Sequence, residues 1–109
     1  MPPKYFKFTI TYNVYGTVYF RTETGTIADF VVKLHYIEKS KDYEIIRYDA
    51  AHGGVHRDVL RPDGSKYIMD EMHHLSKKEG LTFAIKDVRT NWKSYVERFQ
   101  RWHKDQREK

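Results

Sequence analysis

The sequence predicts an α+β domain, in which a five-stranded antiparallel β-meander has a long C-terminal helix packed on one face. Three observations support this prediction. Apolar and polar residues alternate through most of residues 5–60, which is typical of half-buried strands. The connections between these segments are short, so neighbouring strands should run antiparallel. From residue 77 onward, apolar residues recur every three or four positions, which indicates an amphipathic helix.

The first two strands are predicted to form a hairpin. Residues 5–15 alternate cleanly, and Gly16 is predicted to supply the turn. Residues 17–23 then alternate again, with Val18 and Phe20 pointing inward. The inward face of the first strand should carry Phe6, Phe8, Ile10, Tyr12 and Val14.

Three more strands are predicted at residues 29–38, 43–50 and 55–60. A glycine-containing loop, residues 51–54, joins the last two, and Pro62-Asp63-Gly64 ends the fifth strand with strong turn chemistry. Residues 65–75 fit no single pattern, and we expect a short helical turn or an irregular cover there.

The helix is predicted to begin after Ser76, because Ser76 and Glu79 have the spacing of a capping box. Residues 103–109 are expected to fray. The apolar stripe consists of Leu81, Ala84, Ile85, Val88, Trp92, Tyr95, Val96, Phe99 and Trp102. The polar face carries Lys86, Arg89, Lys93, Arg98 and Arg101.

Length and composition limit the class of protein. A chain of 109 residues is expected to form a single α+β domain over residues 1–109. Cysteine is absent, which excludes disulfides and thiolate metal sites. No apolar run approaches the roughly 20 residues of a membrane span, and no signal peptide is visible. These features favour a cytoplasmic protein without membrane contact.

The net charge of +5 is unevenly placed. Residues 1–64 hold nine Lys and Arg against eight Asp and Glu, whereas residues 65–109 hold eleven against seven. A basic half suggests an anionic partner, such as RNA or an acidic protein surface. The alternative is a solvated helix face whose charge serves solubility.

A dense polar cluster lies between residues 47 and 64. Strand alternation places its first members together on the face that the helix leaves open. This group consists of Arg47, Asp49, His56 and Asp58. His52 is expected to hang over the group from the glycine loop.

The cluster contains the parts of a metal-independent ribonuclease. His52 and His56 would act as general acid and base, with Asp49 or Asp58 orienting an imidazole. Phosphate contacts would come from Arg47, Arg57, Lys86, Arg89 and Lys93. The alternative is a structural surface of cross-strand ion pairs, Arg47 with Asp58 and Arg57 with Asp49.

Two further interpretations concern metal and bases. The two histidines and two aspartates have ligand chemistry suited to a divalent ion, but the His-x-x-x-His spacing crosses a Gly-Gly loop without helical register. We therefore predict no metal site and no cofactor. Tyr15 and Tyr19 on the polar side of the first hairpin, near Lys7 and Arg21, resemble the base-stacking surface of single-strand binders.

The segment Arg47-Tyr48-Asp49-x-x-His52-Gly53, followed by His56-x-Asp58 and Pro62-Asp63-Gly64, resembles the centre of small prokaryotic proteins similar to TumE-like toxins of toxin–antitoxin modules. The resemblance implies an RNA-directed role and a neutralising antitoxin protein. A toxin-like, RNA-directed protein is thus the first functional hypothesis. The alternative is a non-catalytic protein-interaction or oligomerisation module, including a homodimer.

Overall fold

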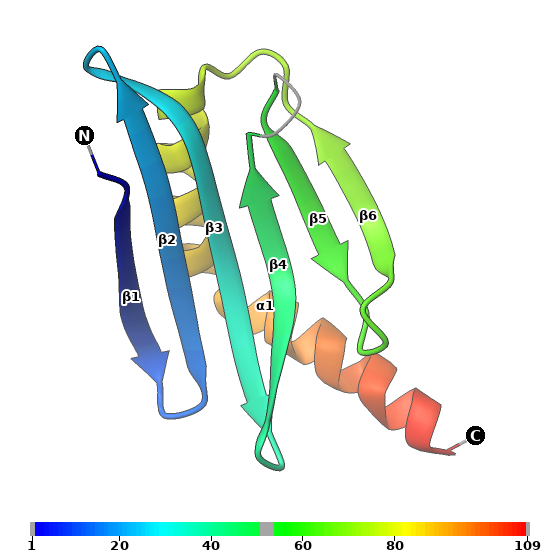
Figure 1. Cartoon of the computed structure of the whole chain (residues 1–109). Helices are drawn as coiled ribbons and strands as arrows, with labels where there is room; N and C mark the ends of the chain where they lie inside the picture. Colours follow the sequence, from blue (N-terminus) through cyan, green and yellow to red (C-terminus); the bar gives the residue numbers. More distant parts are fainter. Residues whose placement is uncertain (1, 51–53, 109) are drawn as a thin grey trace.

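The fold is one antiparallel sheet with one helix on one of its faces (Figure 1). The structure, a computed structural model, describes residues 2–50 and 54–108. Every strand pairs antiparallel with its neighbour in the sequence, so the predicted α+β class and the meander are confirmed. The elements are β1 (Lys4–Thr11), β2 (Val14–Glu23), β3 (Thr26–Glu38), β4 (Lys41–Asp49), β5 (His56–Leu60), β6 (Lys66–Glu71) and α1 (Lys77–Glu108).

The described sheet has six strands, one more than predicted. The additional strand, β6, lies in the segment that the sequence left open between a helical turn and an irregular cover. It pairs with β5 along its length, and the backbone N–H of Met72 donates to the carbonyl of Val55 at 2.8 Å just beyond it. As an edge strand with alternating exposure, β6 has too little apolar alternation to stand out in the sequence.

The first turn lies at Tyr12 and Asn13, and the prediction of a turn at Gly16 is wrong. Asn13 stabilises the turn, because its side-chain amide donates to the carbonyl of Ile37 at 3.3 Å. Tyr12 is accordingly 96% exposed instead of pointing inward. Gly16 lies inside β2 opposite Phe8, whose ring would be 2.1 Å from a Cβ at that position. The glycine therefore makes room for an aromatic ring on the adjacent strand.

A β-bulge at Ile45 adjusts the register of β4. Ile46 pairs with Leu34 and Glu44 pairs with His35, so Ile45 is the extra residue. Both isoleucines are buried as a result, at 2% and 0% exposure. The bulge explains how two successive apolar residues can lie in the core while Arg47 and Asp49 keep their predicted face.

The helix begins as predicted. The Ser76 hydroxyl accepts from the N–H of Glu79 at 3.1 Å, and the Glu79 carboxylate accepts from the N–H of Ser76 at 2.9 Å, which completes the capping box. Gly80 in the first turn is buried, and a Cβ there would lie 2.6 Å from Val55 Cγ2. The glycine allows the helix to approach β5 and β3 closely.

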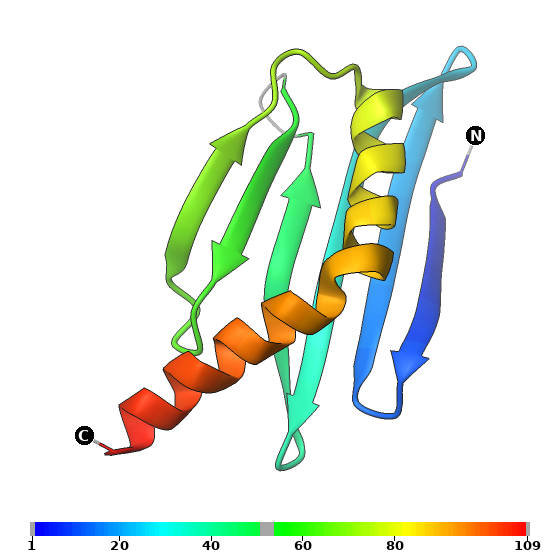
Figure 2. The ribbon, with the colours of Figure 1, turned by 180° about the vertical axis from the view of Figure 1, so that it is seen from behind.

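The helix bends partway along its length. Figure 2 shows its first half running along β2 and β3, and its second half crossing β3 and β4 toward the lower end of β5 and β6. The core between helix and sheet includes Phe30, Val32, Tyr48, Val88 and Phe99. Past residue 102, where the sequence predicted fraying, α1 continues to Glu108, and His103 Nδ1 lies 2.8 Å from Glu38 Oε2. In the described ranges, no helix combines the length and apolarity needed to cross a membrane.

Candidate functional site

The face of the sheet opposite the helix is here called the open face (Figure 1). It carries two rows of mostly polar and aromatic side chains. The register aligns each row across all six strands, one residue per strand. The first row is Tyr5, Tyr19, Val31, Asp49, His56 and Glu71. The second row is Lys7, Thr17, Lys33, Arg47, Asp58 and Met69. The predicted grouping of Arg47, Asp49, His56 and Asp58 on this face is confirmed.

A shallow groove of about 480 Å³, here called the open groove, crosses β1 to β4 on this face. Three cationic side chains line it, and no carboxylate is among the described residues of its lining. Tyr5 is 69% exposed, and Tyr19 is half-buried with its side chain on the groove. The lining residues are Tyr5, Lys7, Tyr15, Thr17, Tyr19, Val31, Lys33, His35 and Arg47.

Tyr15 is held inside a stack and is not available to a base in the way that the sequence suggested. Its ring stacks on His35 with centroids 4.5 Å apart and planes 4° from parallel, and Lys7 Nζ lies 4.2 Å from its centroid. Its hydroxyl donates to Asp42, which also contacts His35 Nδ1 at 2.9 Å. Burial and the hydrogen bond to Asp42 raise the pKa of Tyr15 to about 12, so its phenol stays neutral at physiological pH.

Two of the three cations of the open groove, Lys33 and Arg47, are positioned by carboxylates around it. Glu44 Oε2 lies 3.7 Å from Lys33 Nζ, and Glu44 Oε1 lies 3.6 Å from Arg47 Nη1. Arg47 Nε donates to Asp49 Oδ2 at 3.2 Å. The alternative Arg47–Asp58 ion pair does not form. Asp58 Oδ2 instead lies 3.4 Å from Lys66 Nζ of β6. Such pairs fix the direction of each of these two cations, and each keeps further N–H donors that the pairs do not use.

A second hollow of about 690 Å³, here called the acidic hollow, continues the open face across β4 to β6. Arg47 lines both hollows, so they are contiguous. The other lining residues are Asp49, His56, Asp58, Lys66, Met69 and Glu71. His52, predicted as the partner of His56, lies outside the described residues. No group of three metal-ligating side chains comes together within residues 2–50 and 54–108.

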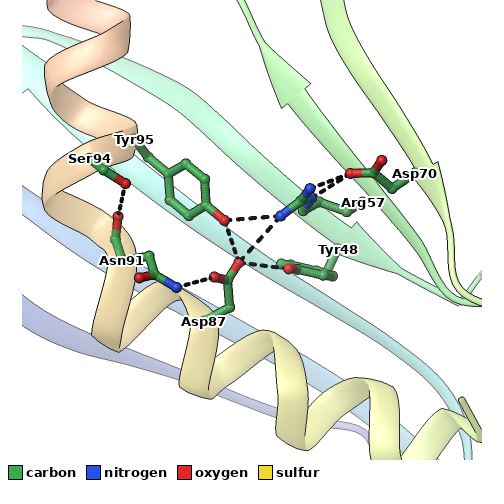
Figure 3. Close-up of polar contacts among 7 residues, drawn as sticks. All are labelled: Tyr48, Arg57, Asp70, Asp87, Asn91, Ser94 and Tyr95. Atoms are coloured by element: carbon green, nitrogen blue, oxygen red, sulfur yellow. Dashed lines mark hydrogen bonds and ion pairs between the residues drawn. The ribbon is translucent and has the colours of Figure 1, made fainter.

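Arg57 lies on the opposite, helix-covered face, so the structure does not bring it together with Arg47 and Asp49 on the open face. Strand alternation explains this position, because Arg57 follows His56 and pairs with Tyr48 in the register. Figure 3 shows its guanidinium donating to Asp70 of β6 and to the hydroxyl of Tyr95, the latter at 3.1 Å.

The group around Arg57 centres on a buried carboxylate and is called the Asp87 network (Figure 3). The hydroxyls of Tyr48 and Tyr95 both donate to Asp87 Oδ2 at 2.6 Å, and Asn91 donates to Oδ1 at 2.7 Å. Arg57 Nη1 lies 3.9 Å from the same carboxylate. The network joins β4, β5 and β6 to the middle of α1, where the helix bends.

Proton affinities in the Asp87 network follow from this geometry. Burial and the hydrogen bond to Asp87 raise the pKa of Tyr95 to about 12 and raise the pKa of Tyr48 further. Burial is the largest single influence on Arg57 and lowers its pKa, but the hydrogen bond to Asp70 and the electrostatic interactions with Tyr48, Tyr95 and Asp70 together raise the pKa. The two tyrosines therefore remain neutral hydrogen-bond donors, and the arginine remains charged. Their contacts form a structural network that holds the helix on the sheet.

The helix cations predicted to contact nucleic acid lie away from the open groove. Lys86 and Lys93 are exposed on α1, and Arg89 lies over the Phe8 ring at 4.2 Å on the helix side of the sheet. One strand of RNA in the open groove cannot touch them, because the sheet stands between. The groove residues that sequence reasoning missed are Tyr5 and Lys33. Lys33 alternates onto the same face as Arg47, and this signal was available.

The comparisons with known proteins give a family and no activity. A family model described as a domain of unknown function, DUF7718, matches residues 1–105. No curated protein and no solved structure matches the chain.

Proposed function

The chain belongs to the DUF7718 family, a domain of unknown function, and we propose from its geometry that it binds single-stranded RNA on the open face of its sheet. Bases would stack on Tyr5 and Tyr19, and phosphates would contact Lys7, Lys33 and Arg47. Single strands suit a shallow sheet surface, because their bases are unpaired and present a flat ring to an aromatic side chain.

The observation that supports this proposal is the composition of the open groove. Three cations share one lining with the exposed Tyr5 and the half-buried Tyr19, and the described lining contains no carboxylate. On the opposite face, the same residue types are packed under the helix: Tyr48 and Tyr95 donate to Asp87, and Arg57 donates to Tyr95. The open groove is therefore the described surface best suited to a polyanion with aromatic bases.

Fluorescence anisotropy with a labelled single-stranded RNA, measured over a range of salt concentrations, tests the proposal. Lys33→Ala should weaken binding and reduce the slope of log affinity against log salt by about 0.7, the value for one phosphate contact on a single strand. Tyr19→Ala should cost about 1–3 kcal/mol of binding free energy with the slope unchanged.

The matched control is Lys93→Ala, which removes an exposed cation from the helix side. It should leave both affinity and salt slope as in the wild type. An equal loss in Lys33→Ala and Lys93→Ala would mean that RNA is attracted by net charge alone. Absence of salt-dependent binding by the wild type would refute the proposal.

A protein-interaction role is the second candidate, and a specific surface favours it. On the helix side, Phe6 of the edge strand β1 is 41% exposed. A hollow of about 650 Å³ lies nearby, lined by Phe20, Ile27 and Leu81 with Lys77 and Lys78 beside them. Such a surface suits a protein partner with acidic side chains, such as the antitoxin that the toxin resemblance implies, or a second copy of the chain. Light scattering of the wild type and Phe6→Asp over a concentration series would detect self-association and its loss.

A further inference from the structure

Two histidines from different parts of the chain converge at the end of the open face. His56 lies on β5, and His73 lies in the connection between β6 and α1. Their ring centroids are 6.4 Å apart, with planes at 83°. His73 Nδ1 lies 3.1 Å and His56 Nε2 lies 3.9 Å from the point that a Cβ on Gly54 would occupy. A nitrogen of each ring thus borders the same small space, which the glycine keeps open.

The carboxylate of Glu71 determines which nitrogen of His73 faces that space. Glu71 Oε2 lies 2.8 Å from His73 Nε2, and an ionised carboxylate only accepts hydrogen bonds. Nε2 therefore carries a hydrogen, and Nδ1 is the nitrogen directed toward Gly54. Among the described residues, Asp49 of β4 and Glu71 of β6 both pair with His56 in the register. Arg47, Asp58 and Lys66 line the same hollow as His56.

The position of the histidine pair matters because the open groove leads to it. His56 is a member of the same cross-strand row as Tyr5 and Tyr19. Arg47 lines both the open groove and the acidic hollow that His56 borders. An RNA strand that lies along this row would bring one phosphodiester next to the two imidazoles. Each carboxylate near the pair also has a cationic or imidazole neighbour, since Asp49 bonds Arg47, Asp58 contacts Lys66 and Glu71 contacts His73.

We propose that His56 and His73 form a general acid–base pair that cleaves the RNA strand bound in the open groove, an inference that rests on the proposed function. The neutral imidazole takes the proton of a ribose 2′-hydroxyl, and the 2′-oxygen forms a bond to the adjacent phosphorus. The bond from phosphorus to the 5′-oxygen breaks, and the protonated imidazole gives its proton to that oxygen. The products are a 2′,3′-cyclic phosphate and a 5′-hydroxyl, and the step requires no other reactant.

This assignment differs from the sequence-based hypothesis in one residue of the pair. Alternation and loop position suggested His52 with His56, whereas the geometry of the described residues pairs His56 with His73. The adjacent His74 is exposed and makes no ring contact with His56 among the described aromatic pairs, so it provides a matched control.

The experiment compares cleavage and binding by the full chain. Cleavage of a labelled single-stranded RNA is measured for the wild type, His56→Ala, His73→Ala and His74→Ala, with circular dichroism to check folding. Loss of either member of the pair should lower the rate on the order of 10²-fold or more, whereas His74→Ala should keep it. EDTA should have no effect, and mass spectrometry should find the cyclic phosphate.

Binding is measured separately with a 2′-O-methyl strand of the same sequence, which has no 2′-hydroxyl to react. His56→Ala and His73→Ala should bind it as the wild type does. The wild-type rate should also fall at both low and high pH, because one imidazole must be neutral and the other protonated. A merely structural histidine would not produce this two-sided profile.

The outcomes separate the two proposals. Binding of the 2′-O-methyl strand without cleavage of RNA would overturn the acid–base pair and leave the proposed function standing. Neither binding nor cleavage would overturn both. Cleavage that is lost in His56→Ala but kept in folded His73→Ala would also overturn the pair.

Discussion

The two faces of the sheet carry the same kinds of side chain in opposite states. On the helix side, Arg57, Tyr48 and Tyr95 are bonded to Asp70, Asp87 or each other in a network that α1 covers. On the open side, Lys33, Arg47 and Tyr19 line a groove that remains open to solvent. The comparison teaches that an arginine or tyrosine contributes to stability when a second layer encloses it, and is available for binding when none does.

The difference follows from dielectric environment. A polar group under the helix has lost its hydration, and burying it costs free energy unless it is hydrogen-bonded. Removing one member of the Asp87 network therefore leaves its partners buried without a hydrogen bond. A cation on the open face keeps much of its hydration, and its ion pairs contribute little to folding. Variants on the helix side should therefore change the free energy of unfolding, and variants on the open side should change ligand binding.

The largest effect is expected for Asp87→Ala. This change leaves the hydroxyls of Tyr48 and Tyr95 without their acceptor and removes a charge beside Arg57. Loss of one partner from such a buried charged network typically costs about 3–5 kcal/mol of unfolding free energy. Urea denaturation measures it, with Glu97→Ala on the exposed side of the same helix as a control that should stay within about 0.5 kcal/mol. Equal losses in both variants would contradict the central role of Asp87.

The next effect should appear at alkaline pH. The pKa of Tyr95 is raised to about 12, above its ordinary value near 10, so the unfolded chain loses this proton first as pH rises. The stabilisation is fully present below pH 10 and declines between pH 10 and about 12. Thermal melts across this range, with tyrosinate absorbance, should show the decline. Tyr95→Phe should make the decline less steep, with the remainder due to Tyr15 and Tyr48, whose pKa values are also raised. An unchanged slope in that variant would contradict this assignment.

A smaller loss is expected for Gly80→Ala. In an exposed helix the change would stabilise by up to about 1 kcal/mol. Here the new Cβ would lie 2.6 Å from Val55 Cγ2 and 3.3 Å from Phe30 Cζ, so the helix must move away from the sheet. Overpacking of this kind costs about 1–3 kcal/mol. A variant that melts higher than the wild type would show that helix and sheet are less closely packed.

Ser76→Ala should cost about 1 kcal/mol, because the N–H of Glu79 loses its acceptor. Chemical denaturation can resolve this difference. Ser76→Asp, which keeps an acceptor at the same position, should restore the stability. If Ser76→Ala melts like the wild type, the capping box contributes nothing.

The smallest effect on folding is expected on the open face. Lys33→Ala should change the unfolding free energy by no more than about 0.5 kcal/mol, since its only described ion pair is a 3.7 Å contact with Glu44 at the surface. The same variant should weaken RNA binding. An effect on binding without an effect on folding would distinguish the open face most clearly from the helix side. A large loss of stability with unchanged RNA binding would reverse the roles of the two faces.

The sequence predicted the elements whose patterns are local. Alternation located four of the strands closely and placed Arg47, Asp49, His56 and Asp58 on one face, because a period of two depends only on neighbouring residues. The capping box at Ser76 and Glu79 is equally local. For each of these features, the residues that determine the structure are close together in the sequence.

The remaining features depend on contacts between distant segments. Gly16 resembles a turn glycine until Phe8 of the adjacent strand is known to cover it. Arg57 was predicted as a phosphate contact beside His56, although alternation places it on the other face of the strand. Its partners Asp70, Tyr95 and Asp87 come from β6 and from the middle of α1. His73 meets His56 only because β6 returns the chain beside β5.

Strand order equals chain order in this sheet, and this has a consequence for how the protein is made. Each new strand can pair with the one synthesised just before it, so the sheet can assemble hairpin by hairpin through short loop closures. The helix that covers the apolar face follows all six described strands in the chain, so it leaves the ribosome after them. Until the helix docks, the apolar side chains of Phe30, Val32 and Tyr48 are exposed to solvent. We therefore expect chains that end before residue 77 to aggregate more than the full chain.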